Sequence, residues 1–569
     1  MEKQWVIKHI ETTQEVENLA SELNVEIPIA KLLIQRGVKT FDEAKAYFRP
    51  KISDLHDPYK MKDMGVAVNR LEKAIKNDER ILIYGDYDVD GTTSVALVYS
   101  FLQDRVSEIK YYIPDRYNEG YGISYKAIDY ADQHDYSLVI ALDCGIKANE
   151  KIDKANELGI DFIICDHHYP GDELPKAVAV LDPKRKDCEY PFKELSGCGV
   201  GFKFLHAFCI KNRISFDELY QYIDLVTVSI ASDIVPVIGE NRVIAHFGLK
   251  KLNSDAMIGL KSIIHLANLG SDITISDIVF KIGPRINAAG RIDSGEKAVD
   301  LLISDKNTAA DKIAKIINVF NNDRKDLDQN ITAEAIEMIK QLDDIESKKS
   351  TVVYNPDWHK GVLGIVASRL IETYYRPTVV LTKSNGFVTG SARSVAGFDL
   401  YKAIESCSDL LENFGGHMYA AGLTLKEENL AKFKNRFDEF VSKNITEVQL
   451  TPQIDIDAII NLGDITPKFY RILKQFQPFG PENMSPVFVT RKVSDFGSGK
   501  LVGKESEHIK FDLVEETDPY KKFPAIGFGL AKFKKILTNR QSFDVCYSIE
   551  ENEFMGKTSL QLRIRDIKV

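Results

Sequence analysis

Three clusters of acidic and histidine residues constrain this chain most, because each begins where a short apolar run ends. They are Asp86, Asp88 and Asp90 after residues 81–84, Asp143 after residues 138–142, and Asp166, His167 and His168 after residues 162–165. Short apolar runs rich in β-branched residues are typical of buried strands in a parallel sheet. Ligands of open α/β sheets bind beyond the carboxyl ends of such strands. Carboxylates crowded at one sheet edge would repel one another unless cations lay between them, so the sequence predicts a divalent-metal site.

The composition is that of an ordinary globular protein with several domains. The chain has 569 residues, 44% of them hydrophobic and 28% charged, and at ~100–200 residues per domain we expect three or four units. No apolar run approaches the ~20 residues of a membrane-spanning helix, and the N-terminus lacks the layout of a signal peptide. The seven cysteines are scattered and form no Cys-x-x-Cys. We therefore expect reduced thiols, a cytoplasmic location and no membrane partner.

The net charge is −10, which at first disfavours a nucleic-acid partner. Part of that acidity is concentrated in the predicted metal site, where bound cations would offset it. A local basic groove can coexist with an acidic total. The net charge therefore does not exclude a nucleic-acid substrate.

The pattern of apolar and turn-forming residues divides the chain into five regions. We expect a helical N-terminal region, an α/β domain with a parallel sheet, a long connecting helix, a smaller α/β domain and a C-terminal β domain. The expected boundaries are 1–75, 76–300, 301–348, 349–448 and 449–569. Strands and helices alternate over 81–181, which indicates right-handed βαβ units. After Pro452, short strands separated by turns predict a small β-barrel or sandwich, with an OB-type barrel as one option.

The connecting segment has apolar residues mainly three and four positions apart, and few helix breakers between 307 and 346. A continuous helix of ~35 residues would be ~50 Å long. A helix of that length commonly connects two domains. The alternative is two shorter helices with a break near Asn321 and Asn322.

The first acidic cluster alternates with Tyr87 and Val89. Alternate residues of an extended chain face one way, so Asp86, Asp88 and Asp90 would converge on one metal-bearing side. For a single Asp, the alternative is a solvated turn or the N-cap of a helix. Three carboxylates in register after a buried strand favour metal binding.

The expected ions are Mn²⁺ or Mg²⁺. Mixed Asp and His ligation suits Mn²⁺ well and Mg²⁺ passably, and the lack of Cys argues against structural zinc. With four or more carboxylates, two ions fit better than one. Two ions ~3.5–4 Å apart lower the pKa of an attacking water and bind the reacting phosphoryl oxygen. The residues thus indicate hydrolysis of phosphate esters. The chain has no Walker A motif, and the Gly-rich segment 197–201 predicts a tight turn and a helix start.

Cationic side chains in Gly-rich segments are the candidates for phosphate contacts. Arg285, Asn287 and Arg291 lie in a segment that we expect to be rich in turns, and Arg393 and His417 lie in two expected loops of the second α/β domain. Arginine forks match phosphate oxygens bidentately. For any single arginine, the alternative is a surface ion pair.

Tyr117 and Tyr121, in the segment 116–122, are candidates for stacking on bases. Such stacking contributes ~1–3 kcal/mol per base without sequence preference. The alternative for both tyrosines is packing in the core.

Taken together, these motifs resemble those of the DHH phosphoesterase superfamily. The matching segments are 86–91, Asp143, 166–168, 231–233, and the Gly-Gly-His-x-x-Ala-Ala-Gly signature of a DHH-associated domain at 415–422. Residues 55–58, 283–291 and 358–370 narrow the resemblance to exonucleases of this superfamily that are specific for single-stranded DNA. The likeness covers nearly the whole chain and is loosest after 452, where such proteins carry an OB-like domain.

The resemblance implies a parallel-sheet DHH domain, a long helix, a smaller α/β DHH-associated domain and an OB-like barrel. It also implies Mn²⁺- or Mg²⁺-dependent hydrolysis of single-stranded DNA in the 5′→3′ direction. Such an enzyme would release 5′-mononucleotides in DNA repair and recombination. The implied partners are a single-strand-binding protein and a RecQ-type helicase, and we expect a monomer.

The resemblance also assigns roles to individual residues. The implied metal ligands are Asp88, Asp90, Asp143, His167 and Asp233, with Asp86 as a further ligand or a supporting carboxylate. The implied catalytic residues are Asp86, Asp88 and His168, of which His168 would contact the scissile phosphate or help to activate water. The implied DNA contacts are Arg285, Asn287, Arg291, Ser391, Arg393 and His417, together with Arg116, Tyr117 and Tyr121.

Two positions depart from the superfamily pattern. Ala392 stands where Gly is more common, so its methyl would reshape a phosphate loop. Asp182 precedes Pro183 where relatives often have Asn, a change that the sequence does not explain.

Two other functions stay open. One is a phosphodiesterase acting on short oligonucleotides or cyclic dinucleotides, and the N-terminal region and the C-terminal barrel argue against it. The other is a non-enzymatic DNA-binding replication scaffold that has lost its metals, and the intact acidic and histidine motifs argue against that.

Overall fold

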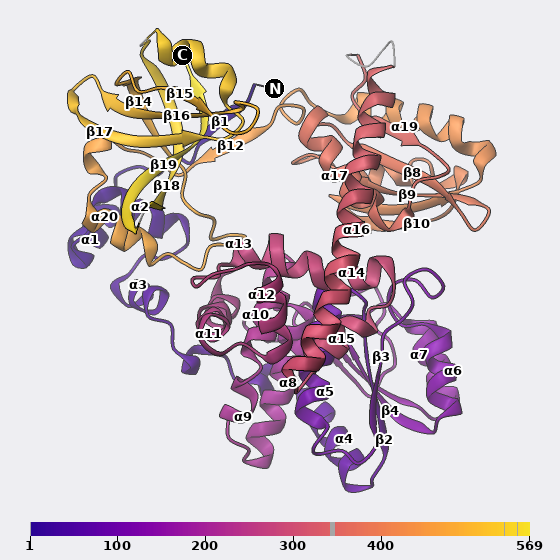
Figure 1. Cartoon of the computed structure of the whole chain (residues 1–569). Helices are drawn as coiled ribbons and strands as arrows, with labels where there is room; N and C mark the ends of the chain where they lie inside the picture. The colour runs from indigo at the N-terminus through magenta and orange to yellow at the C-terminus, as the bar shows by residue number, and fades with distance from the viewer. Residues whose placement is uncertain (1, 342–346, 540, 555) are drawn as a thin grey trace.

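The computed structural model describes residues 2–341, 347–539, 541–554 and 556–569. Figure 1 shows the catalytic domain in purple and magenta, from which the long helix α16 leads to the second α/β domain. The C-terminal β domain lies beside the N-terminus. Within the described ranges, no helix is long and apolar enough to span a membrane.

The catalytic domain is built on a five-stranded sheet in which all neighbouring strands are parallel. In sheet order the strands are β3 (Ile109–Tyr112), β2 (Arg80–Gly85), β4 (Tyr136–Leu142), β5 (Asp161–Cys165) and β6 (Ala179–Leu181). Successive side chains of a strand face opposite sides of the sheet. Ile83 and Ile140 therefore belong to one core, whereas Tyr84 and Ala141 belong to another. Both faces are apolar, as is typical of a parallel sheet covered by helices on each side.

Helices cover both faces of this sheet. The core that contains Ile83 includes residues of α4 (Met64–Lys76), α5 (Val89–Leu102), α8 (Gly197–Asn212), α10 (Ile223–Ser232), α11 (Gly239–Asp255), α12 (Ile258–Leu266), α14 (Gly283–Ile292) and α15 (Glu296–Leu302). On the opposite face, the core that contains Tyr84 includes residues of α6 (Tyr125–Gln133) and α7 (Asn149–Glu157). The short helices α9 (Asp217–Tyr220) and α13 (Ile275–Asp277) complete the domain. The predicted alternation of strand and helix over 81–181 is confirmed.

The connecting segment is one continuous helix, α16, over Asn307–Lys340. Its first half contributes Ala310 and Ile317 to the catalytic core, and its second half contributes Ile331 and Ile339 to a core of the second domain. The alternative break near Asn321 is wrong. That side chain is buried within the helix, and its Oδ1 accepts a hydrogen bond of 3.0 Å from Arg324.

The second α/β domain contains a mixed five-stranded sheet. In sheet order its strands are β10 (Leu411–His417), β11 (Ala420–Leu425), β9 (Phe387–Arg393), β8 (Thr378–Ser384) and β7 (Thr351–Tyr354), and its helices are α17 (Leu363–Tyr374), α18 (Leu400–Glu405) and α19 (Leu430–Asn444). The expectation that residues 390–394 and 414–417 form loops is wrong for most of them, because they lie in β9 and β10. Backbone pairing such as Gly415 with Gly422 holds these Gly-rich strands together without large side chains.

The C-terminal domain contains a closed five-stranded barrel. Its strands are β14 (Phe488–Asp495), β16 (His508–Glu515), β17 (Asp518–Gly527), β18 (Phe543–Phe554) and β19 (Lys557–Lys568), flanked by β13 (Ala458–Ile459), β15 (Lys500–Val502), α20 (Pro467–Lys474) and α21 (Lys534–Thr538). The barrel closes in the order β14-β16-β17-β19-β18-β14, with β17 parallel to β19. A five-stranded closed barrel of this kind is an OB fold, so the predicted OB-type option is confirmed.

The N-terminal region is divided between two cores. Strand β1 (Gln4–Ile7) pairs in parallel with β12 (Gln453–Ile456), and α1 (Gln14–Leu23), α2 (Ile27–Gln35) and α3 (Phe41–Phe48) pack with the barrel. Helix α4 instead joins the catalytic core. The region is therefore mostly helical but includes one strand. The boundaries between the units stay predictions.

Candidate metal centre

The first acidic cluster lies where β2 passes into α5. Asp88 is the N-cap of α5, and its Oδ1 accepts a hydrogen bond of 3.1 Å from the Gly91 N–H. Asp90 is therefore already in the first helical turn. The expected alternation of the three aspartates along an extended chain is wrong, because the chain turns into the helix at Val89. A Cβ at Gly91 would lie 2.3 Å from the Asp86 carbonyl oxygen, so this turn requires glycine.

Asp90 is held by the N-terminus of a second helix. Its Oδ2 accepts from the Gly197 N–H at 2.7 Å, and its Oδ1 accepts from the Cys198 N–H at 2.8 Å and from the Ser229 hydroxyl at 2.7 Å. Helix α8 begins at Gly197 with Ser196 as its N-cap, as the Gly-rich segment predicted. The free N–H groups and dipole of a helix N-terminus stabilise a negative charge. This carboxylate is thus fixed in position.

Three carboxylates converge on the imidazole of His167. Its Nε2 lies 3.2 Å from Asp143 Oδ1, 3.5 Å from Asp233 Oδ2 and 3.7 Å from Asp90 Oδ2. In the part of the chain that the structure describes, His167 Nε2 and Asp143 Oδ1 are buried without a hydrogen-bond partner. Ligand atoms held at about 2.1 Å and at right angles around one ion lie about 3 Å apart. The residues therefore fit a shared divalent cation.

The charges at this edge are uncompensated by the protein. Burial and the neighbouring Asp90 and Asp88 carboxylates raise the pKa of Asp143. Burial and then Asp90 raise the pKa of Asp233 in the same way. Burial lowers the pKa of His167, and neutral imidazole is the form that binds metals. A buried set of acids and one neutral imidazole is a donor set for Mn²⁺ or Mg²⁺.

Asp86 and Asp88 lie beside these residues, but neither belongs to the two groups of side chains that are close enough together to share an ion. Both groups, Asp90 with His167 and Asp233, and Asp143 with His167 and His168, have ligand atoms within 4.8 Å of one another. Asp86 is fully buried, and neither of its oxygens has a hydrogen-bond partner among the described residues. Burial and the Asp88 carboxylate raise the pKa of Asp86. These two acids form an adjoining part of the site, in which Asp88 caps α5 and both Asp86 oxygens lack a partner among the described residues.

The backbone at two points of the centre is in the left-handed region. Asp143 has φ 58°, and Ile234, directly after Asp233, has φ 60°. Ile234 is also 62% exposed. Such a conformation is costly for a β-branched residue, and strain of this kind gathers at functional sites. A Cβ at Gly197 would lie 2.6 Å from the Asp143 Cβ, so helix α8 packs directly against this ligand.

His168 is oriented by two neighbours. Its Nδ1 donates to Asp166 Oδ1 at 2.7 Å, and its Nε2 lies 3.1 Å from the Tyr121 hydroxyl. Burial disfavours the imidazolium, but the hydrogen bond to the Asp166 carboxylate prevails and raises the pKa of His168 to about 9. A protonated His168 would be a donor to a phosphate oxygen. No individual role was predicted for Asp166, although it begins the motif that contains both histidines.

The opposing cationic groups come from the second domain. Arg393 Nη1 donates to Ser391 Oγ at 2.9 Å and to the Ala392 carbonyl oxygen at 2.8 Å. Burial and the nearby Arg116 lower the pKa of Arg393. Partial burial, followed by the charges of Arg393 and His168, lowers the pKa of His417. Basic groups of both domains therefore lie near one another, because Arg116 and His168 of the first domain influence Arg393 and His417 of the second.

A second set of contacts joins the two domains directly. Arg291 Nη1 donates to the Gly361 carbonyl oxygen at 2.9 Å, and the Tyr117 hydroxyl donates to the Arg291 carbonyl oxygen. The Lys360 ammonium lies 4.3 Å from the centre of the Tyr117 ring, and His359 packs edge-on against that ring. Burial and the charges of neighbouring arginines lower the pKa of Arg291 to about 10. Lys360 and His359 lie in the segment 358–370 that narrows the resemblance, but no role was predicted for either residue.

The segment that carries Arg285, Asn287 and Arg291 is the helix α14, so the expectation of a turn-rich segment is wrong. Its Pro284 lies in the first turn, where a missing N–H is tolerated. Arg285 is partly engaged, because its Nε donates to Asn318 Oδ1 at 3.1 Å on α16. Asn287 is half-buried on the same helix.

The two tyrosines of the segment 116–122 lie outside the core. Tyr121 is 54% exposed beside His168, and Tyr117 is half-buried at the junction between the domains. Arg116 lies over the ring of Tyr87, at 4.9 Å from its centre. Core packing is therefore wrong for both tyrosines, and their contact with DNA stays a prediction.

Both departures from the superfamily pattern have a structural account. The Ala392 methyl is buried in the core of the second domain, on the face of β9 opposite Arg393, so the expected reshaping of a phosphate loop is wrong. Asp182 Oδ1 accepts a hydrogen bond of 2.7 Å from the Lys184 N–H, which an asparagine would also accept. Burial raises the pKa of Asp182 to about 7.

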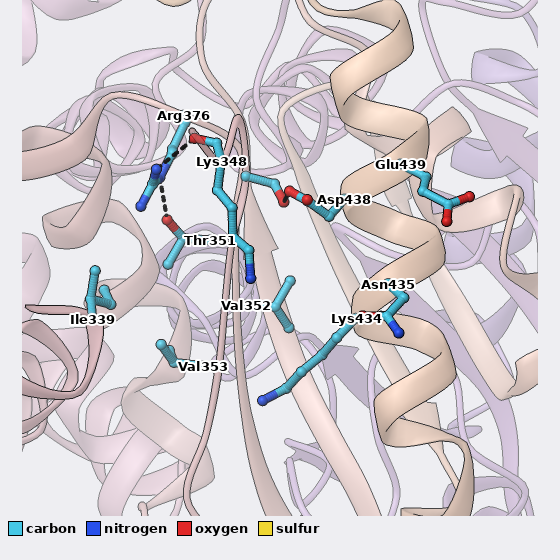
Figure 2. A pocket seen from close by; sticks show the side chains of 11 residues that line it. Ile339, Lys348, Thr351, Val352, Val353, Arg376, Lys434, Asn435, Asp438 and Glu439 are labelled. Carbon is cyan, nitrogen blue, oxygen red and sulfur yellow. Dashed lines mark hydrogen bonds between the residues drawn. The ribbon is translucent and has the colours of Figure 1, made fainter. Parts of the chain in front are cut away.

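A separate hollow of about 370 Å³ lies in the second domain, between the end of α16, β7 and α19. Figure 2 shows the ammonium groups of Lys348 and Lys434 on one side and the carboxylates of Asp438 and Glu439 on the other. None of the metal-centre residues lines it. This hollow is therefore separate from the metal centre.

Three families match successive parts of the chain. The DHH family N-terminal domain matches residues 80–230, the DHHA1 domain matches 347–443, and the RecJ OB domain matches 456–566.

Relatives match over nearly the whole length. The single-stranded-DNA-specific exonuclease RecJ of Bacillus subtilis is 36% identical over 562 residues, which cover 97% of this chain and 69% of the relative. The protein of the same name from Escherichia coli is 31% identical, covering 97% of this chain and 98% of the relative.

Two solved structures are similar in fold to this chain. RecJ from Thermus thermophilus in complex with Mn²⁺ has a TM-score of 0.84 at 24% identity and covers 100% of this chain and 79% of its own. A structure of exonuclease RecJ bound to manganese has a TM-score of 0.61 at 29% identity and covers 70% of this chain and 98% of its own.

Proposed function

Because the chain belongs to the RecJ family of exonucleases, we propose that it hydrolyses the phosphodiester bonds of single-stranded DNA from one end. We further propose that it acts 5′→3′ and releases 5′-mononucleotides in DNA repair and recombination. The observation that carries the proposal is the buried His167 imidazole between three carboxylates, together with the basic groups Arg393 and His417 of the second domain near His168.

The metal centre supplies the chemistry. A bound Mn²⁺ or Mg²⁺ activates water at neutral pH and stabilises charge on the phosphoryl oxygens. Asp90, Asp143, His167 and Asp233 would hold one ion. Asp86 and Asp88, whose carboxylates adjoin this set, would hold a second ion together with Asp143.

The remaining residues bind and orient the substrate. His168, fixed by Asp166 and Tyr121, would donate a hydrogen bond to a nonbridging oxygen of the scissile phosphate. Arg393 with Ser391, and Arg116 across from them, would hold a second phosphate, because guanidinium groups match phosphate oxygens. Arg285, Asn287, Arg291 and His417 would extend this surface along the strand.

Contacts of these kinds read the backbone and the faces of bases, so they carry little sequence information. The proposed enzyme would thus degrade a strand of any sequence. The OB fold supports a polymeric substrate, since such barrels bind single strands. A phosphodiesterase for very short substrates would not need the barrel, and a scaffold without metals would not need this ligand set.

The partners and the location are also proposals. A single-strand-binding protein and a RecQ-type helicase would supply substrate to the enzyme. We propose that it acts as a monomer in the cytoplasm, where its seven free cysteines would stay reduced.

One digestion tests substrate, polarity and metal together. Single- and double-stranded DNA, labelled at the 5′ or the 3′ end, is incubated with Mn²⁺, Mg²⁺ or a chelator. We expect mononucleotides from the 5′ end of single strands with either metal and no product with the chelator. Equal digestion of duplex DNA would contradict the substrate assignment, and release from the 3′ end would contradict the polarity.

A further inference from the structure

The parallel sheet sets the order of the loops along the active edge. Because its strands run in the order β3-β2-β4-β5-β6, the segment with Arg116 and Tyr117 lies at one end of the row. The metal-binding groups follow β2, β4 and β5 in the middle. The loop after β6, with Asp182 and Lys184, lies at the other end, next to Tyr169 from the loop after β5.

Tyr169 and Lys184 form a pair at that end. Tyr169 directly follows His168 and is 71% exposed, and the Lys184 ammonium lies 5.0 Å from the centre of its ring. The Lys184 side chain is only 12% exposed. Its ammonium lies 3.6 Å from Glu194 Oε2, and its backbone N–H is fixed by Asp182. The lysine is thus held in place, whereas the aromatic ring is left open to solvent.

The pair lies close to the metal centre. Tyr169 directly follows His168, and the Asp166 N–H at the start of the same motif donates to the Leu181 carbonyl oxygen at 3.0 Å. The loop that carries Lys184 therefore begins beside the histidine motif, because β6 pairs with β5. An exposed aromatic ring beside a fixed cation is how proteins hold single strands without sequence preference.

The two ends of the row differ in access. At the β3 end, Tyr117 is covered by Lys360 and bonded to Arg291, and these contacts join the two domains. At the β6 end, Tyr169 has one of the most exposed rings of the described residues. A strand terminus fits the closed end, whereas the strand that continues from the scissile bond must leave by the open end.

We propose that Tyr169 and Lys184 form a nucleotide-binding subsite on the polymer side of the scissile phosphate. The base of the first nucleotide that stays with the strand stacks on the open face of Tyr169. The Lys184 ammonium neutralises the phosphate of that nucleotide. This inference rests on the proposed function, because it needs a single strand at the metal centre.

The test places single abasic nucleotides at successive positions of an end-labelled oligothymidylate. Binding is measured by fluorescence anisotropy in an Asp143→Ala background, which removes cleavage and leaves Tyr169 and Lys184 unchanged. The variants are Tyr169→Ala, Tyr169→Phe and Lys184→Gln. Lys186→Gln is the matched control, because Lys186 is exposed two residues further on and has no ion pair among the described residues.

We expect Tyr169→Ala to weaken binding about 5- to 150-fold, the range of base–aromatic stacking, and Tyr169→Phe to bind like the parent. An abasic nucleotide just beyond the scissile bond should weaken DNA binding by the parent protein to a similar extent. The same nucleotide should not weaken binding by Tyr169→Ala any further. Lys184→Gln should reduce by about one the number of ions released on DNA binding, as measured from the salt dependence of affinity. Lys186→Gln should leave that number unchanged.

Two outcomes would overturn the subsite. One is a loss in Tyr169→Ala that is the same for every abasic position, and the other is a loss tied only to the terminal nucleotide. Failure of the proposed function looks different, because the unsubstituted enzyme would then release no nucleotide from any single strand. The anisotropy series still reports whether Tyr169 contacts a base in that case.

Discussion

The two walls of the site are built in opposite ways. The metal-binding wall is the carboxyl edge of a parallel sheet, where Asp90 and Asp143 are buried and backbone N–H groups of α8 hold Asp90. The facing wall combines Arg393 on β9 of the second domain with Arg291 on α14 of the first domain, whose guanidinium donates to the Gly361 carbonyl oxygen. The first wall has an excess of negative charge and the second an excess of positive charge. Each wall is electrostatically incomplete, so the first requires cations and the second requires an anionic substrate.

This difference separates the two halves of the function. The metal-binding wall determines that a phosphate ester is hydrolysed. The cationic wall and the aromatic residues beside it determine that the ester belongs to a nucleic-acid strand. Substitutions in the first wall should therefore act on metal affinity and chemistry, and substitutions in the second should act on DNA binding.

The largest effect is expected for Asp143→Ala. Loss of this ligand should reduce cleavage by at least about 1000-fold, because the ion provides both the nucleophile and charge stabilisation. Saturation with Mn²⁺ at 100 times its dissociation constant stabilises the unsubstituted protein by about 2.7 kcal/mol, and the variant should lose most of that gain. Nuclease assays and thermal unfolding with and without Mn²⁺ measure both. Near-normal cleavage by a folded variant would contradict the ligand assignment.

Arg393→Ala should act on the other wall. Removing a charge-assisted hydrogen bond to phosphate should weaken binding of single-stranded DNA about 10- to 100-fold. The number of ions released on DNA binding, measured from the salt dependence of affinity, should fall by about one. Lys383→Ala on the neighbouring strand β8 is the control, since Lys383 is paired with Glu427 at 2.8 Å. A change in Mn²⁺ affinity instead of DNA affinity would break the division between the walls.

Ser229→Ala should weaken Mn²⁺ binding by about 10-fold, at the low end for residues that orient a metal ligand. Asp90 would lose one of three hydrogen bonds and keep those from Gly197 and Cys198. Titration of the melting temperature with Mn²⁺ measures this shift without relying on activity. The control is Ser232→Ala on the adjoining turn, because its hydroxyl has no partner among the described residues. Equal shifts in both variants would refute the positioning role.

The smallest effect is expected for Ala392→Gly. The methyl packs in the core of the second domain, so its loss should cost about 1–2 kcal/mol of unfolding free energy from lost burial and added backbone entropy. DNA binding should be unchanged, because Arg393 lies on the opposite face of β9. Denaturant unfolding and DNA titration check the two parts. A change in DNA affinity at constant stability would show that this position does contact the phosphate side.

Local sequence patterns predicted much of the catalytic domain. The strands β2, β4 and β5 and the acidic groups at their ends follow from apolar runs of fixed length, and α16 follows from its periodicity. The Gly-rich segments were the main errors. Residues 390–394 and 414–417 looked like loops, because glycine is most common in turns. They are largely strands because neighbours far away in the sequence complete their hydrogen bonding.

The same limit applies inside the metal centre. Asp88 and Asp90 were predicted to be ligands, which stays a prediction, and the expected extended chain is replaced by a helix that begins at Val89. Ser229 gave no signal in the sequence, because its contact with Asp90 bridges 139 positions. Asp166 was visible in its motif, but its hydrogen bond to His168 was not.

The sequence by itself determined which side chains end up at the edge of the sheet. Strand length, side-chain alternation and the position of charge after each apolar run are local properties, and they need no knowledge of the rest of the chain. Only the tertiary structure decided that the N-terminus of α8 fixes Asp90, that β1 joins the C-terminal domain, and that Arg393 faces the metal centre. Those arrangements depend on packing between distant segments, where shape and buried charge select one arrangement that local preferences leave open.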